Sequence, residues 1–314
     1  MRDSLDSVVD EIRRIILSDF EIHKEVNDYL MKMRGKLFRP TLLLLASEVG
    51  GRSHKDAVAL AAVVELVHLA TLVHDDAVDH SVLRRGLPTV NHLWNHQVAI
   101  ITGDFLYSRS ILELTRIGRL EAVHSLARAS NEMSVGEMGQ LISYDALGFS
   151  EEDCYRLMAC KTASLMSAAC DMGGLVGVKE YRDAFRHFGY ALGMAFQIAD
   201  DLLDYEGSEE STGKPVGHDL RERKVTLPLI EAMRHVEPDD RDRIQRFFMR
   251  LEPSDDEIEG IVDAVRRVGG LEYARGKAEE FAQDANSALD KIPLADKAMD
   301  ALRESINYAI ERKR

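Results

Sequence analysis

Residues that interrupt helices are scarce in this chain. Its 314 residues include only seven prolines and 21 glycines, and aromatic residues make up 6%. A β-sandwich or β-barrel needs a turn signal roughly every 8–12 residues, so this scarcity argues against both architectures. Long helices are therefore the expected structure.

Cysteines and long apolar runs are also scarce. The three cysteines are Cys154, Cys160 and Cys170, an odd number without CxxC spacing, which indicates reduced side chains rather than a disulfide scaffold. No stretch approaches 18 uninterrupted apolar residues, and the first residues lack the pattern of a signal peptide. We therefore expect a cytoplasmic protein without an integral membrane span.

Positive charge is in deficit. Lys and Arg number 40 against 54 Asp and Glu, which leaves a formal net charge of −14. Because a surface that binds nucleic acid is normally basic, we expect no nucleic-acid partner. The acidity indicates either carboxylates gathered around cations or a solvated surface, and for most of these charges the second interpretation is simpler.

Helical periodicity recurs along almost the whole chain. The segment from Lys55 to about Asp79 is apolar nearly all round, which is typical of a helix in the centre of a bundle. Polar loops interrupt the pattern at 80–91 and at 207–223, and nothing resembles a linker between two halves. We expect one all-α domain over residues 1–314, with helices at 5–17, 22–33, 39–49, 55–79, 92–116, 119–143, 150–173, 179–204, 224–235, 239–250, 255–266, 271–289 and 294–312.

Two identical DDxxD motifs are the sharpest feature. They consist of Asp75, Asp76 and Asp79, and of Asp200, Asp201 and Asp204. The first and last aspartates of each motif are four positions apart, so on a helix they share one face. Carboxylates placed this close repel one another unless a cation lies between them, and Mg²⁺ prefers such oxygen ligands. One copy could be a solvated helix end, but two copies in matching apolar contexts indicate metal sites.

Short basic clusters lie close to these motifs in the sequence. Lys36 and Arg39 belong to the segment GKLFRP, Arg84 and Arg85 follow the first motif, and Lys214 and Lys224 bracket the loop after the second. Each cluster alone could be solvated surface. Beside carboxylates that hold cations, they favour a ligand that carries phosphate groups.

These residues resemble those of the trans-polyprenyl diphosphate synthase family. The resemblance covers nearly the whole chain and rests on the segments GKLFRP (35–40), ELVHLATLVHDDAVD (65–79), RRGLPTVN (84–91), GDFL (103–106), GEMGQL (136–141), KTASL (161–165), FQIADDLLD (196–204) and GKPVGHDLRERKVTLP (213–228). One departure is Leu37-Phe38, where the family usually has another basic residue. The resemblance implies a helical bundle around a central cavity, the isoprenoid synthase fold.

The resemblance also implies a reaction and the residues that perform it. An allylic diphosphate ionises, isopentenyl diphosphate attacks the cation, and a proton is lost. Two or three Mg²⁺ ions, which Mn²⁺ can replace, would bind to all six aspartates. The residues that would act in catalysis are Asp75, Asp79, Asp200, Asp201, Lys161 and Gln197. The remaining roles are assigned as follows: Arg84, Lys161, Lys214 and Lys224 bind the allylic diphosphate, Lys36, Arg39, His68 and Arg85 bind isopentenyl diphosphate, and Thr162 and Gln197 face the carbocation.

Simpler interpretations remain open for several residues. Gln197 could form an ordinary bond between helices, His68 could be a core histidine, and Gly103-Asp104 is more simply a packing position. His92 and His96 have the spacing of a zinc pair but lack the glutamate of HExxH.

Three other protein classes share some of these features. An HD-type phosphohydrolase would use His74-Asp75 but leaves the second DDxxD unexplained. A non-catalytic synthase subunit commonly lacks one aspartate motif, and a class I terpene cyclase rarely needs a second diphosphate pocket.

The sequence also predicts a product length and an assembly. Val67, Ala70 and Thr71 precede Asp75 on the same helix, and short-chain members of the family place a bulky aromatic side chain near Ala70 or Thr71. Because all three residues are modest in size, we expect a product of about C30 or longer; a C15–C20 product is the alternative. The family also implies a homodimer, and a 207–223 loop that becomes ordered when diphosphate binds.

Overall fold

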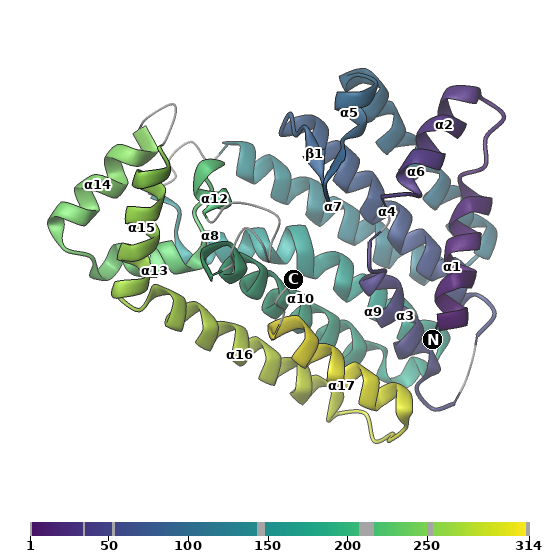
Figure 1. The fold of residues 1–314 in the computed structure, drawn as a ribbon. Helices are drawn as coiled ribbons and strands as arrows, with labels where there is room; N and C mark the ends of the chain where they lie inside the picture. Colours follow the sequence, from purple (N-terminus) through teal and green to yellow (C-terminus); the bar gives the residue numbers. More distant parts are fainter. Residues whose placement is uncertain are drawn as a thin grey trace. The chain divides into compact units, whose positions relative to one another are not determined.

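The computed structural model describes residues 2–33, 35–51, 54–142, 148–206, 217–249 and 254–311, without the side chains of 141 and 142. These residues are almost entirely helical (Figure 1), which confirms the all-α fold class. The elements are α1 (Arg2–Ile15), α2 (Glu21–Leu30), α3 (Phe38–Glu48), α4 (Ala57–Val78), β1 (Leu83–Arg84), β2 (Leu87–Pro88), α5 (Val90–Leu93), α6 (His96–Ile117), α7 (Leu120–Ile142), α8 (Glu151–Met158), the π-helical turn η2 (Ala159–Ala163), α9 (Ser164–Val176), the 3₁₀ turn η3 (Lys179–Tyr181), α10 (Arg182–Glu206), α12 (His218–Arg221), α13 (Leu227–His235), α14 (Pro238–Met249), α15 (Asp255–Arg267), α16 (Gly270–Leu289) and α17 (Lys297–Ile310).

Helix boundaries agree with the periodicity to within a few residues, with local exceptions. The predicted helix 92–116 is two helices, because Asn95 has extended backbone and its side chain accepts a hydrogen bond from the Val98 amide at 2.8 Å, which starts α6. The predicted loop 80–91 contains the antiparallel pair β1–β2. The predicted helix 150–173 contains the π-helical turn η2.

The helix α4 is central among the N-terminal helices, as its apolar sequence predicted. It packs against α1, α3 and α6, and most of its residues between Ala57 and Ala70 are buried (Figure 1). By length and composition alone, α4 is the one helix in the described residues that is long and apolar enough to cross a membrane. However, 67% of its most apolar window is buried by protein, as in the core helix of a folded domain.

The chain forms two compact units that are interleaved in sequence. The first comprises Met1–Ser130, Leu165–Gly189 and Lys291–Leu302, and the second comprises Asn131–Ser164, Tyr190–Asp290 and Arg303–Arg314. The chain passes repeatedly between the units, so no linker signal separates them in the sequence. The first DDxxD motif belongs to the first unit and the second motif to the second unit. The single domain remains a prediction.

A buried ion pair ties three helices together in the first unit. Arg182, at the start of α10, donates to both carboxylate oxygens of Asp171 on α9, at 2.8 and 2.7 Å. The side chain of Asp171 is 3% exposed, and Ser125 on α7 donates a further hydrogen bond to it. A buried carboxylate of this kind is tolerated because it is fully paired.

We expect Arg182→Met to lower the free energy of unfolding by about 3 kcal/mol, because it leaves Asp171 buried with little compensation. The measurement is urea denaturation of the purified protein. Lys179→Ala is the matched control, since the Lys179–Glu121 pair connects nearby parts of the same unit but is largely exposed. Its effect should be much smaller. Equal losses in both variants would contradict the expectation.

Candidate active site

The three carboxylates of the first motif differ in their burial and in their hydrogen bonds. Asp75 is half-buried, and Asp79 is exposed at the residue that ends α4. Asp76 is 4% exposed and accepts hydrogen bonds from Arg84 Nε at 2.9 and 2.8 Å. The predicted metal ligand Asp76 and the predicted phosphate ligand Arg84 therefore bind each other in this structure. Asp75 and Asp79 remain as the carboxylates of this motif that lie nearer the surface.

A tight hairpin presents Arg84 and Arg85. Arg85 and Gly86 connect β1 to β2, and both have positive φ, 53° and 74°. Such a two-residue turn matches the twist of the flanking strands. The hydroxyl of Tyr29 donates to the Pro88 carbonyl at 2.6 Å and attaches the hairpin to α2. The adjacent arginines thus have different partners: Arg84 binds Asp76, and Arg85 Nη1 donates to the Met33 carbonyl at 2.9 Å.

Two of the four residues predicted to bind isopentenyl diphosphate, Arg39 and His68, are in contact in the first unit. Arg39 Nη1 lies 3.2 Å from His68 Nε2. Burial and the charges of Arg39 and Arg85 hold the pKa of His68 well below its usual range, so His68 is a neutral acceptor for Arg39. The fourth predicted residue, Lys36, is exposed in the segment before α3. Sequence reasoning missed Glu65, a buried carboxylic acid one helical turn before His68.

In the second unit, a chain of hydrogen bonds leads to the second motif. Thr162 Oγ1 donates to Gln197 Oε1 at 2.7 Å, and Gln197 Nε2 donates to Asp201 Oδ1 at 2.8 Å. The predicted residues Thr162, Gln197 and Asp201 are therefore brought together. The bond between helices that was the simpler interpretation of Gln197 also exists, since Thr162 and Gln197 lie on different elements.

The second motif is part of a larger acidic cluster. Asp204 accepts hydrogen bonds from the backbone amides of His218 and Asp219 at 3.1 and 3.0 Å, which places α12 beside the motif. Burial raises the pKa of Asp201 well above its usual range, and the charges of Asp219, Asp200 and Asp204 raise it further. Burial and the charge of Asp204 raise the pKa of Asp219 to about 6. Asp219 was not predicted to be a site residue from the sequence, although it lies in the segment GKPVGHDLRERKVTLP that resembles the family.

The predicted lysines of the second unit have acidic neighbours. Lys161 lies in the π-helical turn, with its Nζ 2.6 Å from Glu137 Oε1. A Cβ atom at Gly193 would lie 2.5 Å from the Cα of Ala163, so glycine is what lets α10 approach this turn. Lys224 pairs with Glu222, and its charge opposes the rise in the pKa of Asp219. Lys214 and the 207–216 part of the predicted loop lie outside the described residues.

Backbone strain marks the same places. Among the described residues, four non-glycine residues have left-handed φ: Leu37, His80, Arg85 and Arg223. Arg85 is a predicted site residue, and the others directly follow Lys36 and Asp79 or precede Lys224. This conformation is costly for residues other than glycine, and such residues gather at functional sites. The strain is independent support for the predicted residues, and no sequence signal revealed it.

The donor chemistry fits a divalent cation. In the part of the chain that the structure describes, no three His, Cys, Asp or Glu side chains are already gathered as a metal-ligand group. However, Asp201 is buried and Asp219 half-buried near Asp200 and Asp204. Burial and, after it, the charges of neighbouring carboxylates raise the pKa of Asp201 and of Asp219, and a bound cation would offset both effects. Mg²⁺ commonly binds one or two carboxylates and completes its shell with water and phosphate oxygens.

Of the three residues whose small size predicts a long product, Thr71 differs from the others in its burial. Val67 and Ala70 are 1% and 2% exposed, so both side chains pack against neighbouring residues. Thr71 is only part-buried, and its hydroxyl donates to the His68 carbonyl at 2.8 Å. A larger side chain therefore fits more easily at Thr71 than at the other two positions.

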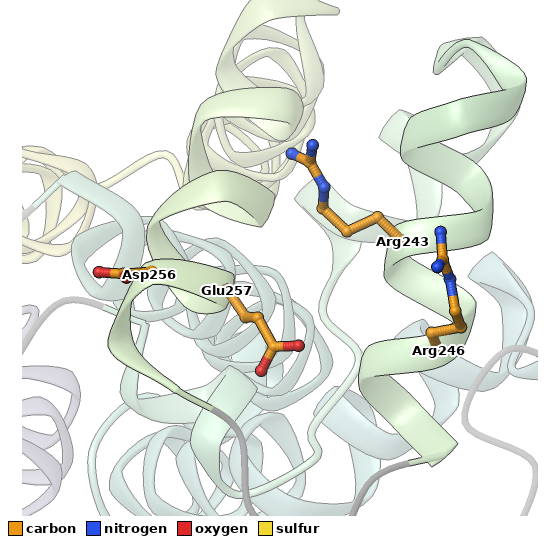
Figure 2. A pocket seen from close by; sticks show the side chains of 4 residues that line it. All are labelled: Arg243, Arg246, Asp256 and Glu257. Carbon is orange, nitrogen blue, oxygen red and sulfur yellow. The ribbon is translucent and has the colours of Figure 1, made fainter.

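Residues for which the sequence favoured a simpler interpretation than ligand binding make contacts within the structure. Gly103 packs directly against the ring of His74, which confirms it as a packing position. His96 stacks on His80, with ring centroids 5.3 Å apart. A hollow of about 390 Å³ is lined by Arg243 and Arg246 of α14 and by Asp256 and Glu257 of α15; Figure 2 shows these four side chains. None of its lining residues belongs to the predicted site, and their charges suit water better than a hydrocarbon chain.

Comparisons with known proteins show which proteins the chain is similar to. Residues 20–265 match the family model described as polyprenyl synthetase. The chain is 35% identical over 280 residues to octaprenyl diphosphate synthase of Escherichia coli, covering 88% of this chain and 86% of that protein. It is 29% identical to geranylgeranyl diphosphate synthase of Saccharolobus solfataricus, covering 96% and 94%. A polyprenyl synthase from Caulobacter crescentus, solved with calcium and isoprenyl diphosphate, has a TM-score of 0.93 and 32% identity, covering 100% and 96%.

Proposed function

The chain belongs to the polyprenyl synthetase family and is a prenyltransferase that makes polyprenyl diphosphates, and from this we propose a Mg²⁺-dependent condensation of isopentenyl diphosphate with an allylic diphosphate. The product we propose is a trans-polyprenyl diphosphate of about C30 or longer. The observation that carries the metal dependence is the acidic cluster of Asp200, Asp201, Asp204 and Asp219, in which Asp204 holds the backbone of Asp219 and in which burial and neighbouring charge raise the pKa of Asp201 and of Asp219.

The carboxylates have the first role in this proposal. Asp75 and Asp79 from α4, and Asp200, Asp201 and Asp204 from α10, would hold two or three Mg²⁺ ions, which Mn²⁺ can replace. These carboxylates would hold the metal, which when bound would supply positive charge against the leaving diphosphate. Gln197 keeps the Asp201 carboxylate in place through its hydrogen bond, and Thr162 in turn orients Gln197. Positive charge for the allylic diphosphate would come from Lys161, Lys214, Lys224 and Arg84. Release of Arg84 from Asp76 would free both of these side chains to bind their ligands.

The cationic set of the first unit has the second role. Lys36, Arg39 and Arg85 carry the positive charge that a second diphosphate needs, and His68 is held neutral beside Arg39. These residues would bind isopentenyl diphosphate and orient its double bond toward the allylic cation. Neither a phosphohydrolase nor a terpene cyclase needs this second set, so the set supports condensation.

Incubation with labelled isopentenyl diphosphate, a C15 allylic primer and Mg²⁺, followed by chromatography of the dephosphorylated products, tests the proposal. We expect consumption of both substrates and a polyprenyl product of C30 or longer. A chelator should abolish the reaction, and Mn²⁺ should restore it. Release of phosphate without chain growth would contradict the condensation, and a product that ends at C20 would support the short-chain alternative.

We further propose a cytoplasmic homodimer. On α6, Ile101 is 57% exposed and Leu112 is 60% exposed, which is unusual for large apolar side chains on one helix of a folded domain. Light scattering at micromolar concentration should give twice the mass of the chain, and Ile101→Glu should shift the protein toward the monomer. A wild-type protein that is monomeric under these conditions would refute the dimer.

A further inference from the structure

The guanidinium group of Arg85 lies directly over the backbone of Gly35 in the first unit. A Cβ atom at Gly35 would lie 2.6 Å from Arg85 Nη2, 2.7 Å from Nη1 and 3.0 Å from Cζ. Carbon atoms in ordinary contact are about 3.5–4.0 Å from their neighbours. The guanidinium therefore occupies the space that a side chain at residue 35 would need.

The backbone conformation of Gly35 does not itself require glycine. Its φ lies outside the left-handed region in which other residues are strained. The three atoms nearest to a Cβ there all belong to the Arg85 guanidinium, which is the movable end of a long side chain. An alanine at residue 35 would thus displace this group by about 1 Å, with little cost to the stability of the fold.

The chain before α3 contacts Arg85 and its hairpin at two further points. Arg85 Nη1 donates to the carbonyl of the buried residue Met33 at 2.9 Å. The Tyr29 hydroxyl on α2 donates to the Pro88 carbonyl at 2.6 Å. The guanidinium and the hairpin that carries it are therefore both attached to the same short part of the chain, which ends at Gly35.

The neighbouring Arg84 is held by another part of the structure. Its Nε donates to both carboxylate oxygens of Asp76 on α4, at 2.9 and 2.8 Å. Arg85 follows in the left-handed conformation, with φ of 53°, and binds Met33 instead. Because the two arginines depend on different contacts, a change at Gly35 displaces Arg85 and leaves the Arg84–Asp76 pair in place.

We propose that Gly35 and Tyr29 are positioning residues, which together fix how Arg85 meets the diphosphate of isopentenyl diphosphate. The inference rests on the proposed function. Gly35 leaves room for the guanidinium beside the Met33 carbonyl, and Tyr29 holds the hairpin. A guanidinium has five N–H donors, so the bond to Met33 orients the group and leaves other donors for phosphate oxygens. Lys36, a second cation predicted for this substrate, directly follows Gly35.

The test compares Gly35→Ala with wild type in steady-state kinetics. We expect the KM for isopentenyl diphosphate to rise about tenfold, because a displaced guanidinium loses the geometry for paired hydrogen bonds to phosphate oxygens. The KM for the allylic diphosphate and kcat should change less than about twofold, since only one substrate loses binding. An unchanged KM for isopentenyl diphosphate, or an equal rise in both KM values, overturns the proposal.

A double substitution separates a role through Arg85 from a general effect on the fold. Arg85→Ala alone should raise the KM for isopentenyl diphosphate, and Gly35→Ala added to it should change that KM less than about twofold, because no guanidinium remains to be displaced. A tenfold rise caused by Gly35→Ala in both backgrounds would overturn the role.

Gly276→Ala is the matched control for the substitution itself. A Cβ atom at Gly276, on α16, would have no other atom within 4 Å among its non-local neighbours in the described structure. This variant should leave both KM values unchanged. A rise in the KM for isopentenyl diphosphate equal to that of Gly35→Ala would overturn the specific role of Gly35.

Tyr29→Phe covers the case in which Gly35→Ala does not fold. It removes the hydroxyl that binds Pro88 but keeps the ring beside that of Trp94, with centroids 5.6 Å apart. It should raise the KM for isopentenyl diphosphate severalfold, and an unchanged KM would overturn the proposal. Failure of the proposed function is distinguishable, because wild type would then consume no isopentenyl diphosphate.

Discussion

Asp75→Ala and Asp201→Ala are each expected to reduce turnover by at least about 10²-fold, which corresponds to about 2.7 kcal/mol of transition-state stabilisation. Each substitution removes a carboxylate that would hold Mg²⁺ against the leaving diphosphate. The measurement is kcat with both substrates saturating. Asp104→Ala and Glu206→Ala are controls, since both residues are exposed acids close in sequence to the predicted site but outside it. An Asp75→Ala enzyme with a near-normal rate would rule out the assignment.

A further substitution, Asp201→Asn, separates loss of function from loss of folding. Because the folded-state pKa values of Asp201 and Asp219 are raised, the folded protein holds their protons more tightly than the unfolded chain does. This contribution to stability is present at low pH and declines as the pH rises from about 4 through about 6 and above. Asp201→Asn should therefore fold at least as stably as wild type at pH 7.5. Mg²⁺ with diphosphate should raise the wild-type melting temperature more at pH 7.5 than at pH 5.

Thr71→Tyr is expected to shorten the product from C30 or longer toward C15–C20. Thr71 lies four residues before Asp75 on α4, about 6 Å along the helix axis. A chain that grows away from the metal along α4 would meet the new ring there. Thr71 is the suitable position because it is only part-buried, whereas a tyrosine at Ala70 or Val67 would overpack the core.

The measurement is the chain-length distribution of products at equal substrate conversion. Thr71→Ser is the control, because it stays small and keeps a hydroxyl for the His68 carbonyl, so product length should not change. If Thr71→Tyr is active and its products keep their length, the limiting wall lies at another residue. A wild-type enzyme that stops at C15 would show that small residues at 67, 70 and 71 do not determine length.

The sequence by itself determined the features that depend on near neighbours along the chain. Helix positions followed from apolar periodicity, and the shared face of Asp75 and Asp79 followed from their spacing. Burial of α4 followed from its apolar surface on all sides. These properties repeat every few residues and need no knowledge of the rest of the fold. The resemblance to known synthases then joined the separate motifs into one predicted activity.

Only the tertiary structure decided which charged groups meet. Asp76 and Arg84 form a pair, although both had been predicted to bind ligands. Asp219 lies half-buried beside the second motif, with its backbone amide bound to Asp204. Spacing along one helix shows which residues share a face but not what packs against that face. Burial, and with it each carboxylate's pKa, depends on contacts between segments far apart in the chain, and such contacts leave no periodic signal in one sequence.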